Sequence, residues 1–211
     1  MRCLDALLPA LCPGLSRGPG RVVELGLGSM PWTSLELSEA LRRLNPELAL
    51  LAVDTDPERV RLATAMGLEA RTGGFGGLPR SRLIRCMNVL RQYPVDAVER
   101  AHSLLIEALE PGGVLLEGTT DKGGHHGVAW VLGAEPGLLF WTDFTRGFAP
   151  RMFQGPLPRD LWRSGRLDVL FADWTARWEA SQGTPRQRFL ASAPGRVLAP
   201  GVVLSPAPDP S

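Results

Sequence analysis

The sequence has 211 residues, of which 44% are hydrophobic and 21% are charged, and this composition is typical of a globular chain that buries its own core. Its 23 basic and 22 acidic residues give a net charge of +1, which excludes the strongly basic balance of a free-standing nucleic-acid-binding protein but leaves a local basic patch open. Three cysteines are too few for a disulfide scaffold, so we predict a reducing, cytoplasmic location. No apolar run reaches the about 18 residues of a membrane span, so we expect no membrane partner.

The sequence divides into four segments by the pattern of its residues. Residues 1–20 contain a short apolar helix followed by a loop rich in glycine and proline. Residues 21–145 alternate strand and helix patterns, and residues 146–198 space leucine and aromatic side chains as helices do. Residues 199–211 form a proline-rich tail, within which 202–204 could add a short strand. We therefore predict one α/β core with a helical C-terminal addition and a loose tail.

The central segment begins with alternating strands and helices. An apolar run at residues 22–25 stops at a glycine, and a second run at 48–53 is unbroken, as in a strand buried on both faces of a parallel sheet. Asp56 before Pro57 is a typical start of the helix that follows. A further helix pattern lies at 94–109, and three further strand patterns lie at 68–71, 83–87 and 114–117. This alternation predicts a Rossmann-like, doubly wound, mostly parallel sheet.

The pattern changes after the fifth predicted strand. Apolar runs at residues 128–132 and 138–144 are separated by Glu135-Pro136-Gly137, which is a typical hairpin turn. We therefore predict that an antiparallel hairpin ends the sheet. Beyond it, arginines between residues 146 and 166 are interspersed with aromatic residues. That stretch could bind an anion or nucleic acid, or it is a connector with solvated arginines.

A glycine loop follows the first predicted strand. Gly26 permits a sharp turn, and Gly28 lets a ligand approach the backbone, where the next helix presents free N–H groups. Asp54 ends the second strand, where a carboxylate can accept hydrogen bonds from both hydroxyls of a ribose. Each feature alone is also typical of an ordinary turn or of a solvated loop acid. Together they predict a nucleoside-binding site.

The residues around the loop discriminate between nucleoside cofactors. Dinucleotide-binding loops carry a third glycine, but Met30 and then Pro31 stand in this place. Glu24, at the end of the first strand, would repel a pyrophosphate and suits a cationic ligand. Tyr93 is the only tyrosine and Lys122 the only lysine, so the chain has no Tyr-x-x-x-Lys pair for a nicotinamide-dependent oxidoreductase. S-adenosylmethionine carries an amino group, a sulfonium and no phosphate, and it fits these features better.

Three motifs in this order resemble class I S-adenosylmethionine-dependent methyltransferases. They are Glu24-Leu25-Gly26-Leu27-Gly28, Ala52-Val53-Asp54-Thr55-Asp56 and Leu109-Glu110-Pro111-Gly112-Gly113-Val114-Leu115-Leu116. The resemblance covers residues 20–145 and implies a seven-stranded sheet whose last strand is antiparallel. It also implies that S-adenosylmethionine is the cofactor. By position, its methionine part would meet Glu24, Gly26 and Gly28, and its ribose would meet Asp54.

The same resemblance implies an adenine site with departures from the family pattern. The third strand is followed by a stretch that contains Thr72, Gly73 and Phe75 instead of the usual acid or amide, so adenine would meet backbone groups and the Phe75 ring. Asn88, at the end of the fourth strand, would also border the cofactor. Met30 in place of the third glycine would narrow the cleft.

A polar cluster follows the fourth strand, at the edge that would face the transferable methyl group. It consists of Asn88, Arg91, Gln92 and Tyr93, and together with residues 185–189 it resembles a group of bacterial methyltransferase-domain proteins. Asn88 lacks the prolines of an Asn-Pro-Pro-Tyr motif, so methylation of a base amino group is not indicated. The cluster either faces the methyl acceptor or is a hydrogen-bond network that only shapes the pocket.

Histidines and one cysteine also have side chains suited to catalysis. His125 could act as a general base. With His126 and Asp121 it could hold a metal ion, but no further ligand has suitable spacing, so we expect no metal and favour an exposed polar loop. His102 lies mid-helix and is expected at the surface, whereas Cys86 lies within a strand and is expected to pack in the core.

The sequence therefore predicts an S-adenosylmethionine-dependent methyltransferase that acts on a methyl acceptor of open identity. The candidate catalytic residues are Asn88, Arg91, Tyr93 and His125. Two alternatives stay open: a module that binds S-adenosylmethionine or S-adenosylhomocysteine without catalysis, and a nicotinamide-dependent oxidoreductase. The sequence predicts no oligomeric state.

Overall fold

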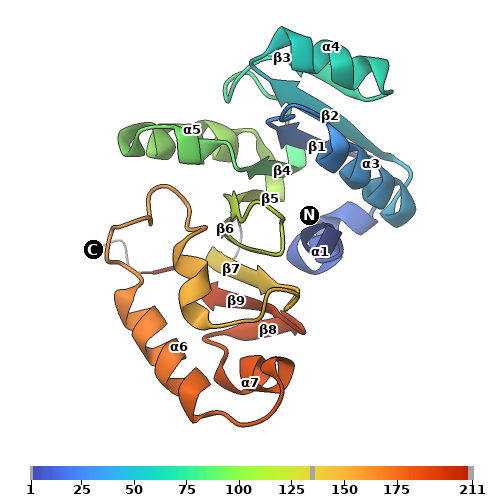
Figure 1. The fold of residues 1–211 in the computed structure, drawn as a ribbon. Helices are drawn as coiled ribbons and strands as arrows, with labels where there is room; N and C mark the ends of the chain where they lie inside the picture. The colour runs from blue at the N-terminus through green and yellow to red at the C-terminus, as the bar shows by residue number, and fades with distance from the viewer. Residues whose placement is uncertain (1, 134–135, 209–211) are drawn as a thin grey trace.

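A single mixed sheet runs through the molecule. The computed structural model describes residues 2–133 and 136–208, and within them nine strands pair in the order β3-β2-β1-β4-β5-β6-β7-β9-β8. Figure 1 shows this sheet from β3 at the top to β8 at the bottom. The strands are β1 (Gly20–Leu25), β2 (Leu48–Asp54), β3 (Glu69–Thr72), β4 (Ser81–Met87), β5 (Leu109–Thr120), β6 (His126–Leu132), β7 (Gly137–Thr142), β8 (Arg196–Ala199) and β9 (Val202–Pro206).

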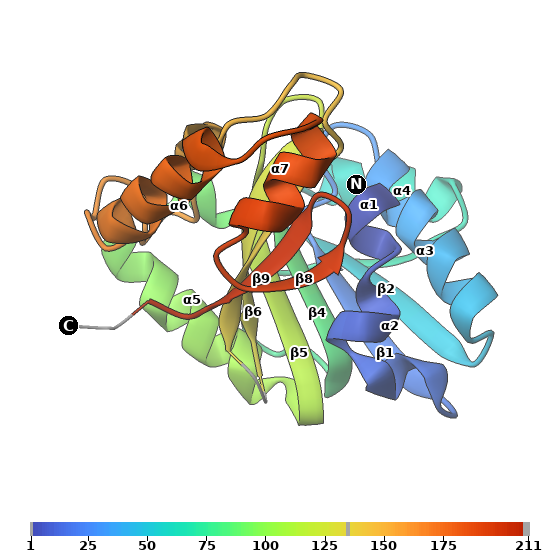
Figure 2. The same cartoon turned by 90° about the horizontal axis from the view of Figure 1, so that it is seen from below.

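Helices cover both faces of the sheet. One face carries α1, α2 and α3, and the opposite face carries α5 and α6 (Figures 1 and 2). The α-helices are α1 (Arg2–Asp5), α2 (Leu8–Leu11), α3 (Trp32–Leu44), α4 (Pro57–Ala65), α5 (Val95–Glu107), α6 (Asp168–Ala180) and α7 (Pro185–Ser192). Short 3-10 helices are η1 (Pro13–Ser16), η2 (Leu90–Gln92) and η3 (Pro150–Gln154). In the described part of the chain, no helix is both long and apolar enough to cross a membrane.

The predicted doubly wound arrangement is confirmed for β1 to β5. These strands pair in parallel in the order β3-β2-β1-β4-β5. β2 is buried along its last five residues, as its unbroken apolar run predicts. Asp56 starts α4 as predicted, because its Oδ1 accepts the Glu58 N–H at 2.9 Å. β1 lies between β2 and β4, so the strand order reverses there and opens a crevice beyond the carboxyl ends of these strands.

The other half of the sheet is antiparallel and larger than predicted. β6 and β7 form the predicted hairpin, although Glu135 of its expected turn lies outside the described residues. The count of seven strands is wrong, because β9 pairs with β7 and β8 pairs with β9. The tail is therefore not loose throughout. Val202 and Val203 bury their side chains against opposite faces of the sheet, which favours a strand over a free tail.

The C-terminal region packs directly on the antiparallel half. Phe140 of β7, Phe153 of η3 and Trp174 of α6 belong to one buried cluster, and the Phe153 and Trp174 rings stack at 5.4 Å between centroids. Trp174 and Trp178 are core residues, as their spacing predicts. β6 and β7 share this buried cluster with α6 and α7. The hydrophobic core therefore continues across the predicted boundary at residue 145. The addition is also not purely helical, since β8 begins within it at Arg196 and belongs to the sheet.

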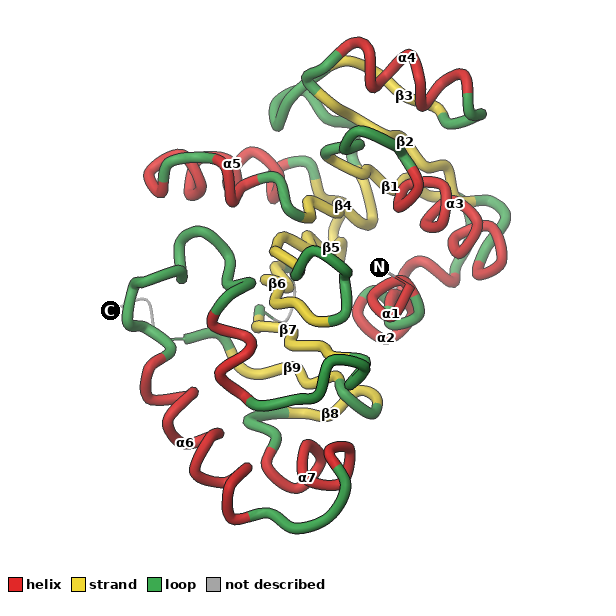
Figure 3. The backbone as a smooth tube through the Cα atoms, in the orientation of Figure 1, coloured by secondary structure: helices red, strands yellow, loops and turns green. Residues whose placement is uncertain are grey.

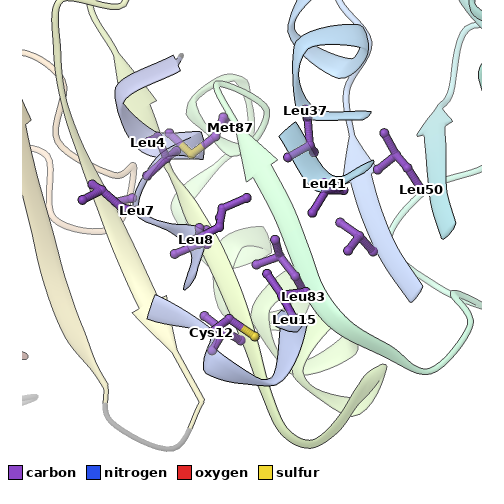
Figure 4. Close-up of a cluster of buried hydrophobic side chains, with 14 of the residues drawn as sticks. Leu4, Leu7, Leu8, Cys12, Leu15, Leu37, Leu41, Leu50, Leu83 and Met87 are labelled. Carbon is purple, nitrogen blue, oxygen red and sulfur yellow. The ribbon is translucent and has the colours of Figure 1, made fainter. Parts of the chain in front are cut away.

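The N-terminal segment packs on the face of the sheet that also carries α3 (Figure 1). It forms two separate helical turns, α1 and α2, where the sequence predicts one helix, and Pro9 stands in the first turn of α2. Figure 4 shows Leu4 and Leu8 turned towards Met87 and Leu83 of β4. Residues 2–16 thus cover the sheet beside α3, where β4 would otherwise expose its apolar face.

Candidate functional site

A cleft of about 570 Å³ opens at the carboxyl ends of β1, β2 and β4. This size lies within the usual range for small-molecule sites. Most residues predicted to bind the cofactor line it, namely Glu24, Gly26, Gly28, Asp54, Gly73, Phe75 and Asn88. Thr72 does not: it is exposed at the end of β3, and the chain reaches the cleft one residue later, where the Gly73 N–H donates to the Asp54 carbonyl at 3.0 Å.

The glycine turn after β1 forms one wall of the cleft. Gly26 and Gly28 have φ of 85° and 64°, a region that side chains other than glycine rarely adopt. A Cβ on Gly26 would stand 2.5 Å from Cγ2 of Val89. Glycine at this position is therefore required both by the backbone and by the close approach of the loop after β4.

Asp54 organises the meeting point of β1 and β2. Its Oδ2 accepts the Leu27 N–H at 2.7 Å, and its Oδ1 accepts the Asp56 N–H at 2.9 Å. Arg59 lies 3.6 Å from Oδ2 and also lines the cleft. A carboxylate has about four lone-pair positions, so each oxygen of Asp54 can accept one further hydrogen bond from a ligand.

The Glu24 carboxylate is paired with a residue that the sequence analysis did not select. Arg85 stands beside it on β4, and Nε and Nη2 of Arg85 donate to the two Glu24 oxygens, the second at 3.0 Å. Nη1 of Arg85 donates to Asp5 of α1, and Nη2 also donates to the Thr33 carbonyl at 3.1 Å. A buried carboxylate requires such partners, because desolvation otherwise makes its charged form very unfavourable.

The Asp5–Arg85–Glu24 triad sets two carboxyl groups against one guanidinium. Glu24 lines the cleft, whereas Asp5 lines a separate groove beside α3. All three side chains are at least 95% buried. Burial raises the pKa of Glu24 and of Asp5 above their usual values, against the lowering effect of the Arg85 guanidinium. The attraction of Glu24 for a cationic ligand stays a prediction, because Arg85 donates to both oxygens of this carboxylate.

One member of the polar cluster after β4, Asn88, bonds to the neighbouring strand β5. Asn88 Oδ1 accepts the Thr120 N–H at 2.9 Å, and Nδ2 donates to the Thr120 hydroxyl at 3.1 Å. Tyr93 lines the cleft, with its ring edge-on to Phe75 at 5.4 Å. Arg91 is exposed on η2 and does not line the cleft.

Asn88 adopts a backbone conformation that few residues accept. Its φ is 63°, where asparagine is tolerated and a β-carbon costs about 1 kcal/mol. We expect Asn88→Gly and Asn88→Ala both to lose the bonds to Thr120, and Asn88→Ala to be the less stable variant by about 1 kcal/mol. Urea denaturation of the two variants measures this difference. Equal stability, or a more stable alanine variant, would contradict the left-handed conformation.

Two other predicted residues lie away from the cleft. His102 is not at the surface: its side chain is 15% exposed, and Nε2 lies 3.3 Å from Glu117 Oε2 on β5. Helix α5 packs on the sheet, so its inward positions place this imidazole over β5. Cys86 is fully buried, and burial raises its pKa well above the usual value, so it packs in the core as predicted.

The loop after β5 contributes residues that the sequence analysis did not select. Lys122, Gly123 and Gly124 line the cleft. His125 follows them but does not line it; its Nδ1 lies 2.8 Å from Oδ2 of Asp143. No group of three or more His, Cys, Asp or Glu side chains in residues 2–133 and 136–208 is arranged to hold a metal ion.

Sequence signals existed for some of the missed residues. Arg85 interrupts an otherwise apolar strand, and a charge in that place needs a buried partner. Asp5 interrupts the apolar N-terminal stretch in the same way. Neither position reveals that the two side chains meet, because that contact depends on how residues 2–16 lie on the sheet.

Comparison with known proteins gives one local sequence match. No family model matches the chain. A curated relative, the ribosomal RNA small subunit methyltransferase H of Saccharopolyspora erythraea, is 42% identical over 62 residues. The match covers 28% of this chain, which spans only 17% of that relative's length.

Solved structures give weak overall similarity. The magnesium protoporphyrin IX methyltransferase of Synechocystis PCC 6803 is 15% identical, with a TM-score of 0.44 over 61% of this chain and 69% of that one. The CMeT domain of the citrinin polyketide synthase is 18% identical, with a TM-score of 0.43 over 50% and 30% of the two chains. The plantazolicin methyltransferase in complex with SAH is 11% identical, with a TM-score of 0.42 over 56% and 46%.

Proposed function

We propose that the chain is an S-adenosylmethionine-dependent methyltransferase. The observation that carries the proposal is the carboxylate of Asp54 at the end of β2, held by the backbone of the glycine turn after β1 and facing a cleft at the reversal of strand order. A ribose with two free hydroxyls is the ligand group that such a carboxylate recognises. The 62-residue match with a curated methyltransferase supports the same function.

The cleft residues fit the three parts of this cofactor. The ribose hydroxyls would donate to Asp54, and the methionine part would lie along Gly26 and Gly28. With both carboxyl groups ionised, the triad at Glu24 would bear a net charge of −1, which would suit the charged ammonium and sulfonium groups and oppose a pyrophosphate. Adenine would meet Gly73 and Phe75, which line the same cleft.

The chain's contribution to the reaction is alignment. When bound, the cofactor supplies an electrophilic methyl group. Methyl transfer is a displacement in line with the bond that breaks, so holding both reactants in register supplies much of the rate enhancement. Asn88 fixes the end of β4 to β5 and thereby sets the cleft wall beside Tyr93. The bonds of Asn88 to Thr120 favour this shaping role over direct contact with an acceptor.

We further propose that the predicted core, residues 21–145, holds the whole cofactor site and that the protein works in a reducing compartment. The cleft-lining residues fall between Glu24 and Gly124. Cys12 and Cys86 are free and buried, which supports a reducing location. The methyl acceptor is not part of this proposal.

Calorimetric titration tests the proposed function. We expect S-adenosylmethionine and S-adenosylhomocysteine to bind with one site per chain, and NADH not to bind, because its pyrophosphate would face the anionic triad. Absence of heat with both sulfur ligands, in a sample shown to be folded by circular dichroism, would overturn the proposal. Binding of NADH instead would support the nicotinamide-dependent alternative.

A further inference from the structure

The loop after β5 and the end of β7 place an imidazole and a carboxylate together beside a residue of the cleft. His125 directly precedes β6 and Asp143 directly follows β7, and the Asp143 N–H donates to the His125 carbonyl at 2.9 Å. The antiparallel pairing of β6 and β7 therefore fixes the two residues opposite each other. Nδ1 of His125 lies 2.8 Å from Oδ2 of Asp143 and 2.9 Å from Oγ1 of Thr145.

The hydrogen bonds of Thr145 determine which imidazole nitrogen carries the proton. The Thr145 hydroxyl donates to Oδ1 of Asp143 at 2.6 Å, and a hydroxyl has only one hydrogen to donate. The Thr145 hydroxyl oxygen therefore accepts a hydrogen bond from His125. Nδ1 of His125 carries this hydrogen, which is shared between Oγ1 of Thr145 and Oδ2 of Asp143. In the neutral imidazole, Nε2 is then an acceptor with a free lone pair.

This free nitrogen lies against a residue of the cleft. A Cβ on Gly123 would stand 2.6 Å from Nε2 and 2.4 Å from Cδ2 of His125, so only glycine leaves room for the ring. Gly123 itself lines the cleft, between Lys122 and Gly124. The His125 and Asp143 side chains are 32% and 28% exposed, so solvent reaches the imidazole beside this cleft residue.

Asp143 is suited to support a positive charge on this ring. Burial opposes its ionisation, but hydrogen bonds from Thr145 and His125 outweigh burial and lower the pKa of Asp143 from 3.8 to about 2. The carboxylate is therefore charged at neutral pH. A charged carboxylate that accepts from Nδ1 stabilises the imidazolium formed when Nε2 takes a proton.

We propose that His125, oriented by Asp143 and Thr145, is the general base for the methyl acceptor. The inference rests on the proposed methyltransferase function. In the step, the acceptor's oxygen or nitrogen forms a bond to the methyl carbon, and the bond from that carbon to sulfur breaks. Sulfur keeps the electron pair and becomes a neutral thioether, while the acceptor's proton moves to Nε2. The acceptor class is therefore a hydroxyl or an N–H compound that must lose a proton.

The imidazole tautomer tests the geometry without any acceptor. The chain has three histidines, so a sample labelled with nitrogen-15 in histidine gives few signals. We expect the neutral ring of His125 to carry its proton on Nδ1 and none on Nε2. In Asp143→Asn, the amide can donate to the ring, and we expect the proton to move to Nε2. A wild-type ring protonated at Nε2, or the same tautomer in both proteins, would overturn the proposal.

A pair of cofactor analogues tests whether the base faces the acceptor position. Sinefungin carries an amine where S-adenosylmethionine carries its methyl group, and S-adenosylhomocysteine carries neither. We expect sinefungin to shift the Nε2 resonance of His125 well beyond the shift caused by S-adenosylhomocysteine. His102 serves as the internal control, since it pairs with Glu117 away from the cleft. Equal shifts with both ligands would overturn the proposal.

The affinity of His125→Asn for S-adenosylhomocysteine distinguishes a general base from a residue that binds the cofactor. We expect His125→Asn to bind S-adenosylhomocysteine with a dissociation constant within about threefold of wild type, because a base for the acceptor does not hold the thioether product. A tenfold or larger loss would assign His125 to the cofactor instead. If the wild type does not bind S-adenosylhomocysteine at all, the proposed function fails, and the tautomer result still stands as a separate finding.

Discussion

Replacing Arg85 with methionine is expected to lower the free energy of unfolding by about 3–5 kcal/mol, the usual cost of removing one partner from a buried ion pair. The guanidinium holds Glu24 and Asp5 together, and its side chain is fully buried. Methionine fills a similar volume, so the loss comes from two carboxylates without a cation and not from a cavity. Guanidinium chloride denaturation followed by tryptophan fluorescence measures it.

The pH dependence of this loss identifies its cause. The pKa of Glu24 is already raised by burial in the wild type, and without Arg85 it rises further. A carboxyl group whose pKa is higher in the folded than in the unfolded state stabilises the fold below the unfolded pKa, and this contribution disappears as the pH rises through the folded pKa. The deficit of Arg85→Met is therefore expected to be smaller at pH 5 than at pH 8.

A surface arginine on the neighbouring strand provides the control. Arg21 of β1 pairs with Glu69 at 3.1 Å, but both side chains are well exposed. Arg21→Met is expected to change stability by less than about 1 kcal/mol, because solvent screens exposed pairs. If Arg85→Met behaved like Arg21→Met, the buried triad would be wrong.

Replacing Asp54 with alanine is expected to weaken binding of S-adenosylhomocysteine by about 100-fold or more. Two hydroxyls that donate to a carboxylate contribute about 1.5–3 kcal/mol each, and the variant loses both. It also loses the anchor of the Leu27 N–H, so the glycine turn is less well fixed. Calorimetric titration of the variant measures the loss.

Asp56→Ala is the matched control for Asp54→Ala. Asp56 lies two residues further along and accepts the Glu58 N–H as the cap of α4, outside the cleft lining. We expect this variant to lose about 1 kcal/mol of stability and to keep its affinity within about threefold. Full affinity in Asp54→Ala would contradict the assignment of the ribose to this carboxylate.

The parallel half of the fold could be predicted because its signals are local. The unbroken apolar run of β2, the cap at Asp56 and the glycine turn each reflect contacts within a few residues. β9 was harder, because Val202 and Val203 join the sheet through pairing with β7, more than 60 residues earlier in sequence. The proline-rich composition around them favours a loose tail when no partner strand is known.

Local sequence signals likewise predict only a part of the candidate site. Gly26, Gly28 and Asp54 could be predicted, since strand-end loops of a parallel sheet meet at one edge. The pairing of Glu24 with Arg85 needed the register of β1 against β4, and its third member comes from α1. His125 was a candidate by residue type, but Asp143 and Thr145 reach it only because β6 and β7 pair in a particular register.

A crystal structure of the protein soaked with S-adenosylhomocysteine tests the central claim most directly. We expect density in the cleft, with both ribose hydroxyls within hydrogen-bond distance of Asp54 and the amino-acid end beside Gly26. Figure 3 shows the strands β1, β2 and β4, whose carboxyl ends this cleft adjoins. Ligand density elsewhere, such as the groove between α2 and α3, or a ribose turned away from Asp54, would contradict the account.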